Sequence, residues 1–107
     1  AKDSFINLNL WDVVKPKAVF SKDVTEVANS VANGSVDVGF VYESDTYNRE
    51  DIKRQFKVDS ALHCPIVYPV AILQNSQTPE SAKNFTDFLK TKPVEKIFTK
   101  YGFGIAK

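Results

Sequence analysis

One helix with clear signals at both ends constrains the fold of this chain more than any other feature. Asp23 can act as its N-cap, and Glu26 three residues later completes a variant of the capping box. Asn33-Gly34 supplies the left-handed residue that commonly ends a helix. Between these signals the apolar positions form one stripe at helical spacing, made by Val24, Val27, Ala28 and Val31. The sequence therefore predicts an amphipathic helix that begins at Val24.

Apolar and β-branched segments on both sides of this helix predict strands. Residues 18–20 precede the helix and residues 36–42 follow it. A strand, a helix and a second strand in this order form a βαβ unit, which implies a parallel sheet with a right-handed crossover. Residues 52–58 alternate in polarity and predict an edge strand, and residues 66–73 predict another, in which Pro69 argues against a central, fully paired position. The predicted fold class is therefore α/β.

Further helices are predicted at both ends of the chain. Residues 1–11 are expected to be the tail of a helix, because apolar residues recur at helical spacing at Phe5, Leu8 and Trp11. Pro79, preceded by Thr78, and Pro93 each mark the first turn of a later helix. Gly102 ends the second of these helices.

Composition and charge narrow the functional classes. The chain has 107 residues, which is one domain at most. Lys and Arg number 14 and Asp and Glu 13, so the net charge of +1 argues against a nucleic-acid binder that relies on a strong basic field. No apolar run approaches the ~20 residues of a membrane-spanning helix. The chain contains no Met, so we expect that a segment upstream of Ala1 was removed.

Val24 and Tyr42 are the candidate binding residues of the predicted βαβ unit. The first N–H groups of a helix have no partner within the helix and carry partial positive charge. If Asp23 satisfies a donor at the second or third position, the N–H of Val24 is left for an anion. Tyr42 ends the apolar strand, where its hydroxyl can donate to a ligand at the sheet edge. Both residues also fit a purely structural role.

His63 and Cys64 are adjacent residues with reactive side chains. Neighbours in an extended chain point apart, so the pair is poorly placed to act as a nucleophile and its base. A metal site would need more ligands at regular spacing. We expect loop and packing roles for both residues, and neither a metal nor a cofactor.

Three motifs resemble the second half of a known family. Residues 39–45 read Gly-Phe-Val-Tyr-Glu-Ser-Asp, residues 68–71 read Tyr-Pro-Val-Ala, and residues 97–103 read Ile-Phe-Thr-Lys-Tyr-Gly-Phe. In this order and spacing they are similar to the periplasmic molybdate-binding proteins of ABC importers, from about Leu10 to the C-terminus. The resemblance implies the C-terminal half of a type II periplasmic-binding-protein fold. Its parts are a parallel βαβ unit, a crossing strand and two C-terminal helices.

The resemblance also implies how an anion is bound. Members of that family hold a tetrahedral oxyanion between two α/β lobes through backbone N–H groups and hydroxyls, without a metal or a salt bridge. The matching donors here are the backbone N–H of Val24 and the hydroxyl of Tyr42. The implied ligand is molybdate or tungstate, and the implied partner is the membrane permease of an ABC importer. The implied protein is exported to the periplasm or the cell surface, is not an enzyme and binds no nucleic acid.

The resemblance divides the chain into two parts. Residues 1–67 correspond to part of the second lobe, and residues 68–107 to the return crossing strand and the C-terminal helices. The family's other contacts to the anion come from two serines of the first lobe and from a loop that precedes this chain. We therefore expect a missing N-terminal half, or another copy of the chain, to cover the apolar faces of the C-terminal helices.

Two other functions stay open from the sequence. The same fold serves as the effector-sensing domain of transcription regulators, in which a helix-turn-helix precedes it. An enzyme that uses Cys64 and His63 is the third possibility, and alkylation of Cys64 would abolish its activity.

Among oxyanions, a phosphate site would want a buried carboxylate to accept its proton. The only carboxylate near Val24 that could serve is Asp23, which is already assigned to capping.

Overall fold

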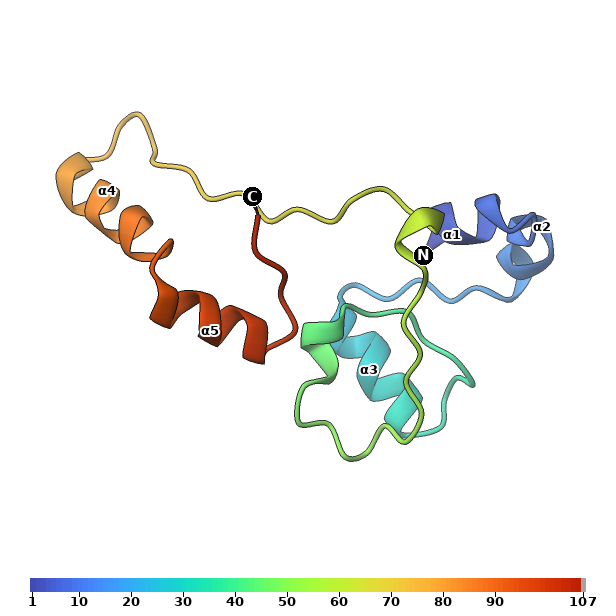
Figure 1. The fold of residues 1–107 in the computed structure, drawn as a ribbon. Helices are drawn as coiled ribbons and strands as arrows, with labels where there is room; N and C mark the ends of the chain where they lie inside the picture. The colour runs from blue at the N-terminus through green and yellow to red at the C-terminus, as the bar shows by residue number, and fades with distance from the viewer. Residues whose placement is uncertain (107) are drawn as a thin grey trace. The chain divides into compact units, whose positions relative to one another are not determined.

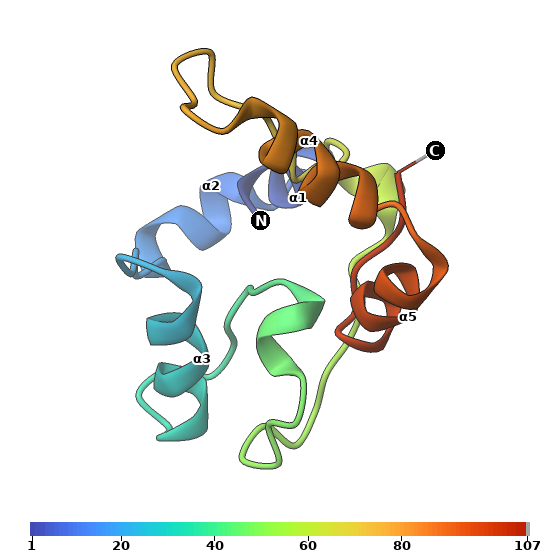
Figure 2. The same ribbon diagram turned by 90° about the vertical axis from the view of Figure 1, so that its left-hand side faces the viewer.

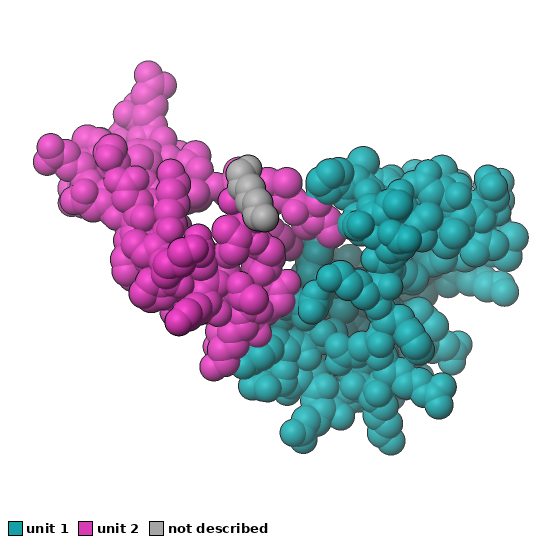
Figure 3. All heavy atoms as spheres, viewed as in Figure 1, with its two compact units in different colours: residues 1–65 teal, residues 66–107 magenta. Residues whose placement is uncertain are grey.

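The computed structural model describes residues 1–106, which form helices joined by open segments of chain (Figure 1). The chain divides into two compact units, Ala1–Pro65 and Ile66–Lys107, which Figure 3 colours separately. In chain order the helices are α1 (Lys2–Asn7), α2 (Trp11–Val14), η1 (Lys15–Lys17), α3 (Val24–Ala32), η2 (Glu43–Thr46), η3 (Ser60–Leu62), α4 (Pro79–Phe88) and α5 (Lys92–Lys100), where η denotes a 3-10 helix.

Helix α3 forms where the sequence predicts it and for the predicted reason. The Asp23 carboxylate accepts the backbone N–H of Glu26 at 2.8 Å. The Glu26 carboxylate accepts the N–H of Lys22 at 2.9 Å, one residue earlier than in a standard capping box. The helix ends at Ala32 with Asn33 as its C-cap, and Gly34 follows with a φ of 79°. The signals at both ends are thus confirmed.

The predicted helix over residues 1–11 is wrong in its extent. Helix α1 ends at Asn7, and α2 begins only at Trp11. Between them Asn9 has a φ of 57°, a left-handed conformation that an uninterrupted right-handed helix cannot contain. The regular apolar spacing across this segment therefore runs over two short helices, and it does not mark one long helix.

The four predicted strands do not form within residues 1–106. Residues 18–20, 36–42, 52–58 and 66–73 belong to neither helix nor strand. A strand requires a neighbouring extended segment about 4.8 Å away that exchanges backbone hydrogen bonds with it. No part of the described chain pairs with these segments in that way. Their composition suits a strand, but composition cannot supply the partner, and the βαβ unit is not confirmed.

Gly39 lies in close contact with α3. A Cβ atom at this position would lie 2.6 Å from Cγ2 of Val31 and 2.8 Å from Cγ1 of Val27. The next residue, Phe40, meets the ring of Phe5 edge to face, with the ring centroids 5.0 Å apart. Residues 39–40 therefore pack against both α3 and α1.

The unit Ile66–Lys107 contains α4 and α5. Both helices have proline in their first turn, as predicted, and Gly102 follows α5 with a φ of 90°. After α5 the chain turns back, so that the ring of Phe103 meets Phe98 at 6.1 Å and Tyr68 at 5.6 Å between centroids. These edge-to-face contacts hold the segment after α5 against the start of the unit.

Few apolar side chains are buried. Among residues 1–106 the buried apolar residues are Ala28 and Val94, which are 2% and 6% exposed. Large apolar side chains are exposed on α4 and α5, with Phe85 59%, Phe88 54% and Ile97 55% exposed. Apolar burial is the main driving force for folding. Within residues 1–106 many large apolar side chains remain exposed and so contribute little to the stability of the fold.

Candidate functional site

Val24 is the first residue of α3, and its side chain is half-buried. A helix provides no carbonyl partner for the N–H at its first position. The Asp23 carboxylate bonds to Glu26, at the third position, so this cap does not satisfy the N–H of Val24. The helix dipole adds partial positive charge at the same end. The chemistry of this position therefore suits an anion, and the binding of an anion by Val24 stays a prediction.

Tyr42 immediately precedes η2, and 42% of it is exposed. Its backbone is extended, with φ −81° and ψ 153°. Two hydrogen bonds join it to Asp45: the N–H of Tyr42 donates to Oδ2 of Asp45 at 2.9 Å, and the N–H of Asp45 donates to the carbonyl of Tyr42 at 3.0 Å. The tyrosine therefore stands at a turn whose backbone is fixed by a neighbouring carboxylate.

Helix α3 and η2 contact each other within the unit Ala1–Pro65, and η2 runs beside α3 in both ribbon views (Figure 1, Figure 2). Val24 begins the first of these elements, and Tyr42 comes directly before the second. The structure therefore places the two predicted residues on neighbouring elements of one unit. That their donor groups reach the same ligand stays a prediction.

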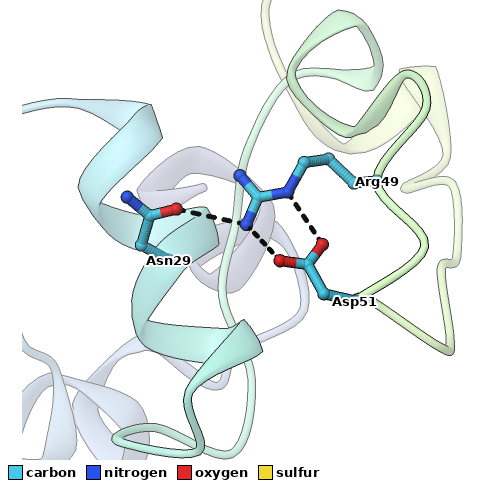
Figure 4. Close-up of polar contacts among 3 residues, drawn as sticks. All are labelled: Asn29, Arg49 and Asp51. Atoms are coloured by element: carbon cyan, nitrogen blue, oxygen red, sulfur yellow. Dashed lines mark hydrogen bonds and ion pairs between the residues drawn. The ribbon is translucent and has the colours of Figure 1, made fainter.

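Arg49 links the segment after η2 to α3 (Figure 4). Its guanidinium donates to both carboxylate oxygens of Asp51, at 2.8 and 2.9 Å, and Nη2 also donates to Oδ1 of Asn29 at 3.1 Å. The hydrogen bond from Arg49 holds the pKa of Asp51 below its usual value, and the same bond raises the pKa of Arg49. Sequence inspection does not reveal this cluster, because Asn29 lies twenty residues from Arg49.

Three carboxylates near the candidate residues already accept backbone hydrogen bonds. Asp23, Glu26 and Asp45 each accept a backbone N–H at 2.8 to 2.9 Å. Each bond offsets part of the negative charge that would otherwise repel an incoming anion. Within residues 1–106, no group of three or more His, Cys, Asp or Glu residues could hold a metal ion.

His63 and Cys64 lie after η3, apart from these elements in sequence. Nδ1 of His63 lies 2.8 Å from the carbonyl oxygen of Cys64, so the ring bonds to the backbone of its neighbour. The Cys64 thiol is exposed. The residues border a surface depression together with Asp3, Ile6 and Asn7. This geometry agrees with the loop role predicted for the pair.

Comparison with known proteins adds information about the whole chain. Residues 1–104 match the family model described as "Bacterial extracellular solute-binding protein". A solved substrate-binding domain from Clostridium difficile, assigned to a molybdenum ABC transporter, superposes with a TM-score of 0.80 at 44% identity. The match covers 98% of this chain and 46% of that one. It supports a periplasmic-binding-protein fold, although the strands of that fold are not formed in residues 1–106.

Curated relatives give the same picture. YvgL of Bacillus subtilis, described as a substrate-binding lipoprotein of an ABC transporter, is 38% identical over 102 residues, which are 95% of this chain and 39% of YvgL. The molybdate-binding protein ModA of Haemophilus influenzae is 30% identical over 103 residues, and ModA of Escherichia coli is 30% identical over 105. These matches cover 96% and 98% of this chain and 40% of each ModA protein.

The chain thus spans about 40% of the length of the curated relatives it matches. The named relatives are solute-binding proteins, which agrees with the expectation that the chain is not an enzyme and lends no support to the transcription-regulator alternative. A further finding concerns membranes: none of the helices within residues 1–106 is long and apolar enough to cross one. The family model matches residues 1–104, which are nearly the whole chain, and this chain therefore belongs to the bacterial extracellular solute-binding proteins.

Proposed function

We propose that this chain is part of the substrate-binding component of an ABC importer and that it binds molybdate or tungstate. The backbone N–H of Val24 and the hydroxyl of Tyr42 are the donors that it contributes. The observation that carries the proposal is the contact between α3, which begins at Val24, and η2, which Tyr42 precedes. The names of the relatives, several of which are molybdate-binding proteins, support the choice of ligand.

Helix-terminus and hydroxyl donors suit a tetrahedral dianion. Oriented N–H and O–H dipoles stabilise the charge without bringing in a counter-ion. Selectivity then comes from the size of the cavity and the geometry of the donors. Lys22 contributes its backbone N–H to the capping arrangement of α3, because this N–H donates to the Glu26 carboxylate. The charge of the Lys22 side chain is not needed for this arrangement. The proposed site needs no metal and no cofactor.

The full binding cleft would be completed by a second lobe. Residues 1–67 would form part of one lobe, and residues 68–107 would carry the return crossing strand and the helices that pack on the other lobe. The chain covers 46% of the matching Clostridium structure, so the strand partners absent here would come from the remainder of such a protein. The same remainder, or another copy of the chain, would cover the exposed apolar faces of α4 and α5.

The proposed protein is exported and works with a membrane permease. The family description is extracellular, and one relative is described as a lipoprotein. The location would be the periplasm or the outer face of the cell membrane. The binding protein would close around the anion by a hinge motion and deliver it to the permease.

Calorimetric titration of the full-length protein that contains this chain tests the proposal. Molybdate, tungstate, sulfate and phosphate would be titrated at the same ionic strength, because charge effects depend on salt. We expect saturable heat with molybdate and tungstate and none with sulfate or phosphate at the same concentrations. Saturable binding of sulfate or phosphate with no response to molybdate would contradict the proposal.

A further inference from the structure

We infer that Asp45 is a positioning residue for the anion site and that it acts by fixing the backbone from which the Tyr42 side chain extends. This inference rests on the proposed function, because it concerns the tyrosine assigned to the ligand. Asp45 itself need not touch the anion. The inference goes beyond the two donors by naming the residue that holds one of them in place.

The geometry of the turn carries the inference. Two hydrogen bonds, at 2.9 and 3.0 Å, run in opposite directions between the backbone of Tyr42 and the carboxylate and N–H of Asp45. Together they close a ring that includes the backbone of Tyr42 and restrains its φ and ψ. The Cα–Cβ direction follows from these angles, so they set where the phenol can reach. Tyr42 is the N-cap residue of η2 and itself belongs to neither a helix nor a strand.

A third hydrogen bond stiffens the same turn. The hydroxyl of Thr46 donates to the carbonyl of Glu43 at 3.0 Å, one residue on from the Asp45 ring. Asp45 is half-buried, whereas the neighbouring Glu43 is exposed and its carboxylate lies 3.8 Å from Nζ of Lys57. Of the two acidic residues in η2, Asp45 alone is bonded to the backbone of Tyr42 in the described chain. This difference makes Asp45 the residue to test.

The charge of Asp45 and its hydrogen bonds to Tyr42 should affect anion binding in opposite directions. As a negative charge three residues from Tyr42, the carboxylate should disfavour a dianion. As an acceptor that orders the turn, it should favour binding, because less conformational entropy is lost when the ligand arrives. Asp45→Asn removes the charge and keeps an acceptor oxygen, whereas Asp45→Ala removes both. The two substitutions therefore separate the effects.

Molybdate titration of the full-length protein tests the inference. We expect Asp45→Ala to raise the Kd about tenfold, within the range for residues that share one hydrogen-bond network. Asp45→Asn should bind as tightly as the wild-type protein or more tightly. In a Tyr42→Phe background, Asp45→Ala should add at most about a twofold loss, since the hydroxyl it positions is gone. Asp87→Ala, which breaks an exposed pair with Lys83 on α4, is the matched control and should leave the Kd unchanged.

The outcomes separate this inference from the function on which it depends. If the wild-type protein does not bind molybdate, the proposed function fails and the inference fails with it. If the wild-type protein binds and Tyr42→Phe weakens binding, but Asp45→Ala matches the wild-type Kd or loses affinity equally in the Tyr42→Phe background, only the inference is overturned. Should Asp45→Ala not fold, Asp45→Asn decides alone, and a large loss of affinity in that variant contradicts the positioning role.

Discussion

At the scale of single residues, the account depends on two donors of different kinds. Tyr42 would contribute a side-chain hydroxyl, and Val24 would contribute only its main chain. Substitution therefore affects the two residues differently. The sequence predicts both positions through local rules, since a capped helix start and the end of an apolar segment are visible without a fold. It does not reveal Arg49, because the bond from this residue to Asn29 depends on how the chain folds back on α3.

Removal of the Tyr42 hydroxyl should weaken anion binding. Tyr42→Phe keeps the ring and deletes one charge-assisted hydrogen bond, for a loss of about 1.5–3 kcal/mol. This loss corresponds to a roughly 10- to 150-fold increase in the molybdate Kd of the full-length protein, measured by calorimetry. Tyr47→Phe, on the same segment but after η2, serves as the control. Equal affinities for Tyr42→Phe and the wild-type protein would remove Tyr42 from the site.

Val24 allows a test of a main-chain donor. Proline is well tolerated at the first position of a helix, so Val24→Pro should leave α3 intact while it deletes the N–H. We expect a loss of molybdate affinity of about 1.5–3 kcal/mol for Val24→Pro. Val24→Ala keeps the N–H and should bind almost as the wild-type protein does. Circular dichroism would check that both variants retain helix, and similar Kd values for the two would exclude the backbone donor.

At the scale of elements, local signals were sufficient for some segments and insufficient for others. The ends of α3 and the starts of α4 and α5 follow from capping residues and prolines that act within one turn. The helix predicted over residues 1–11 is interrupted at Asn9, because this residue has a left-handed conformation although the apolar spacing is regular. The four apolar segments did not form strands, because strand formation depends on a partner that no local pattern can supply.

The packing of residues 39–40 on α3 gives a prediction at this scale. Gly39→Ala would place a Cβ atom 2.6 Å from Val31 and 2.8 Å from Val27, closer than side chains can approach without movement. Such overpacking costs about 1–3 kcal/mol of unfolding free energy. Thermal or urea denaturation of the full-length protein measures it. Gly104→Ala is the control, because a Cβ atom there meets nothing within 4 Å, and an equal effect of both substitutions would contradict the close contact.

At the scale of the whole molecule, the small apolar core and the partial coverage of the relatives both suggest that this chain is part of a larger fold. Only Ala28 and Val94 are buried apolar residues within residues 1–106, and the chain spans about 40% of its curated relatives. Strand partners and a cover for the apolar faces of α4 and α5 would both come from outside this chain. The resemblance found in three sequence motifs thus extends to family membership, while the division at residues 67 and 68 stays a prediction.

The 107-residue chain on its own should not behave as a compact domain. We expect a helical far-ultraviolet spectrum, binding of a hydrophobic dye and a calorimetric unfolding enthalpy well below the ~60–80 kcal/mol typical of 100 residues. The full-length protein, studied in parallel, should bind little dye and unfold cooperatively. A sharp transition with the full enthalpy in the isolated chain would show that its core is sufficient without a second lobe.

The most direct test of the central claim is a crystal structure of the full-length protein with molybdate. The account predicts that one bound anion accepts hydrogen bonds from both the backbone N–H of Val24 and the hydroxyl of Tyr42, at about 2.6–3.2 Å. An anion held elsewhere, or one that contacts neither group, would contradict the account.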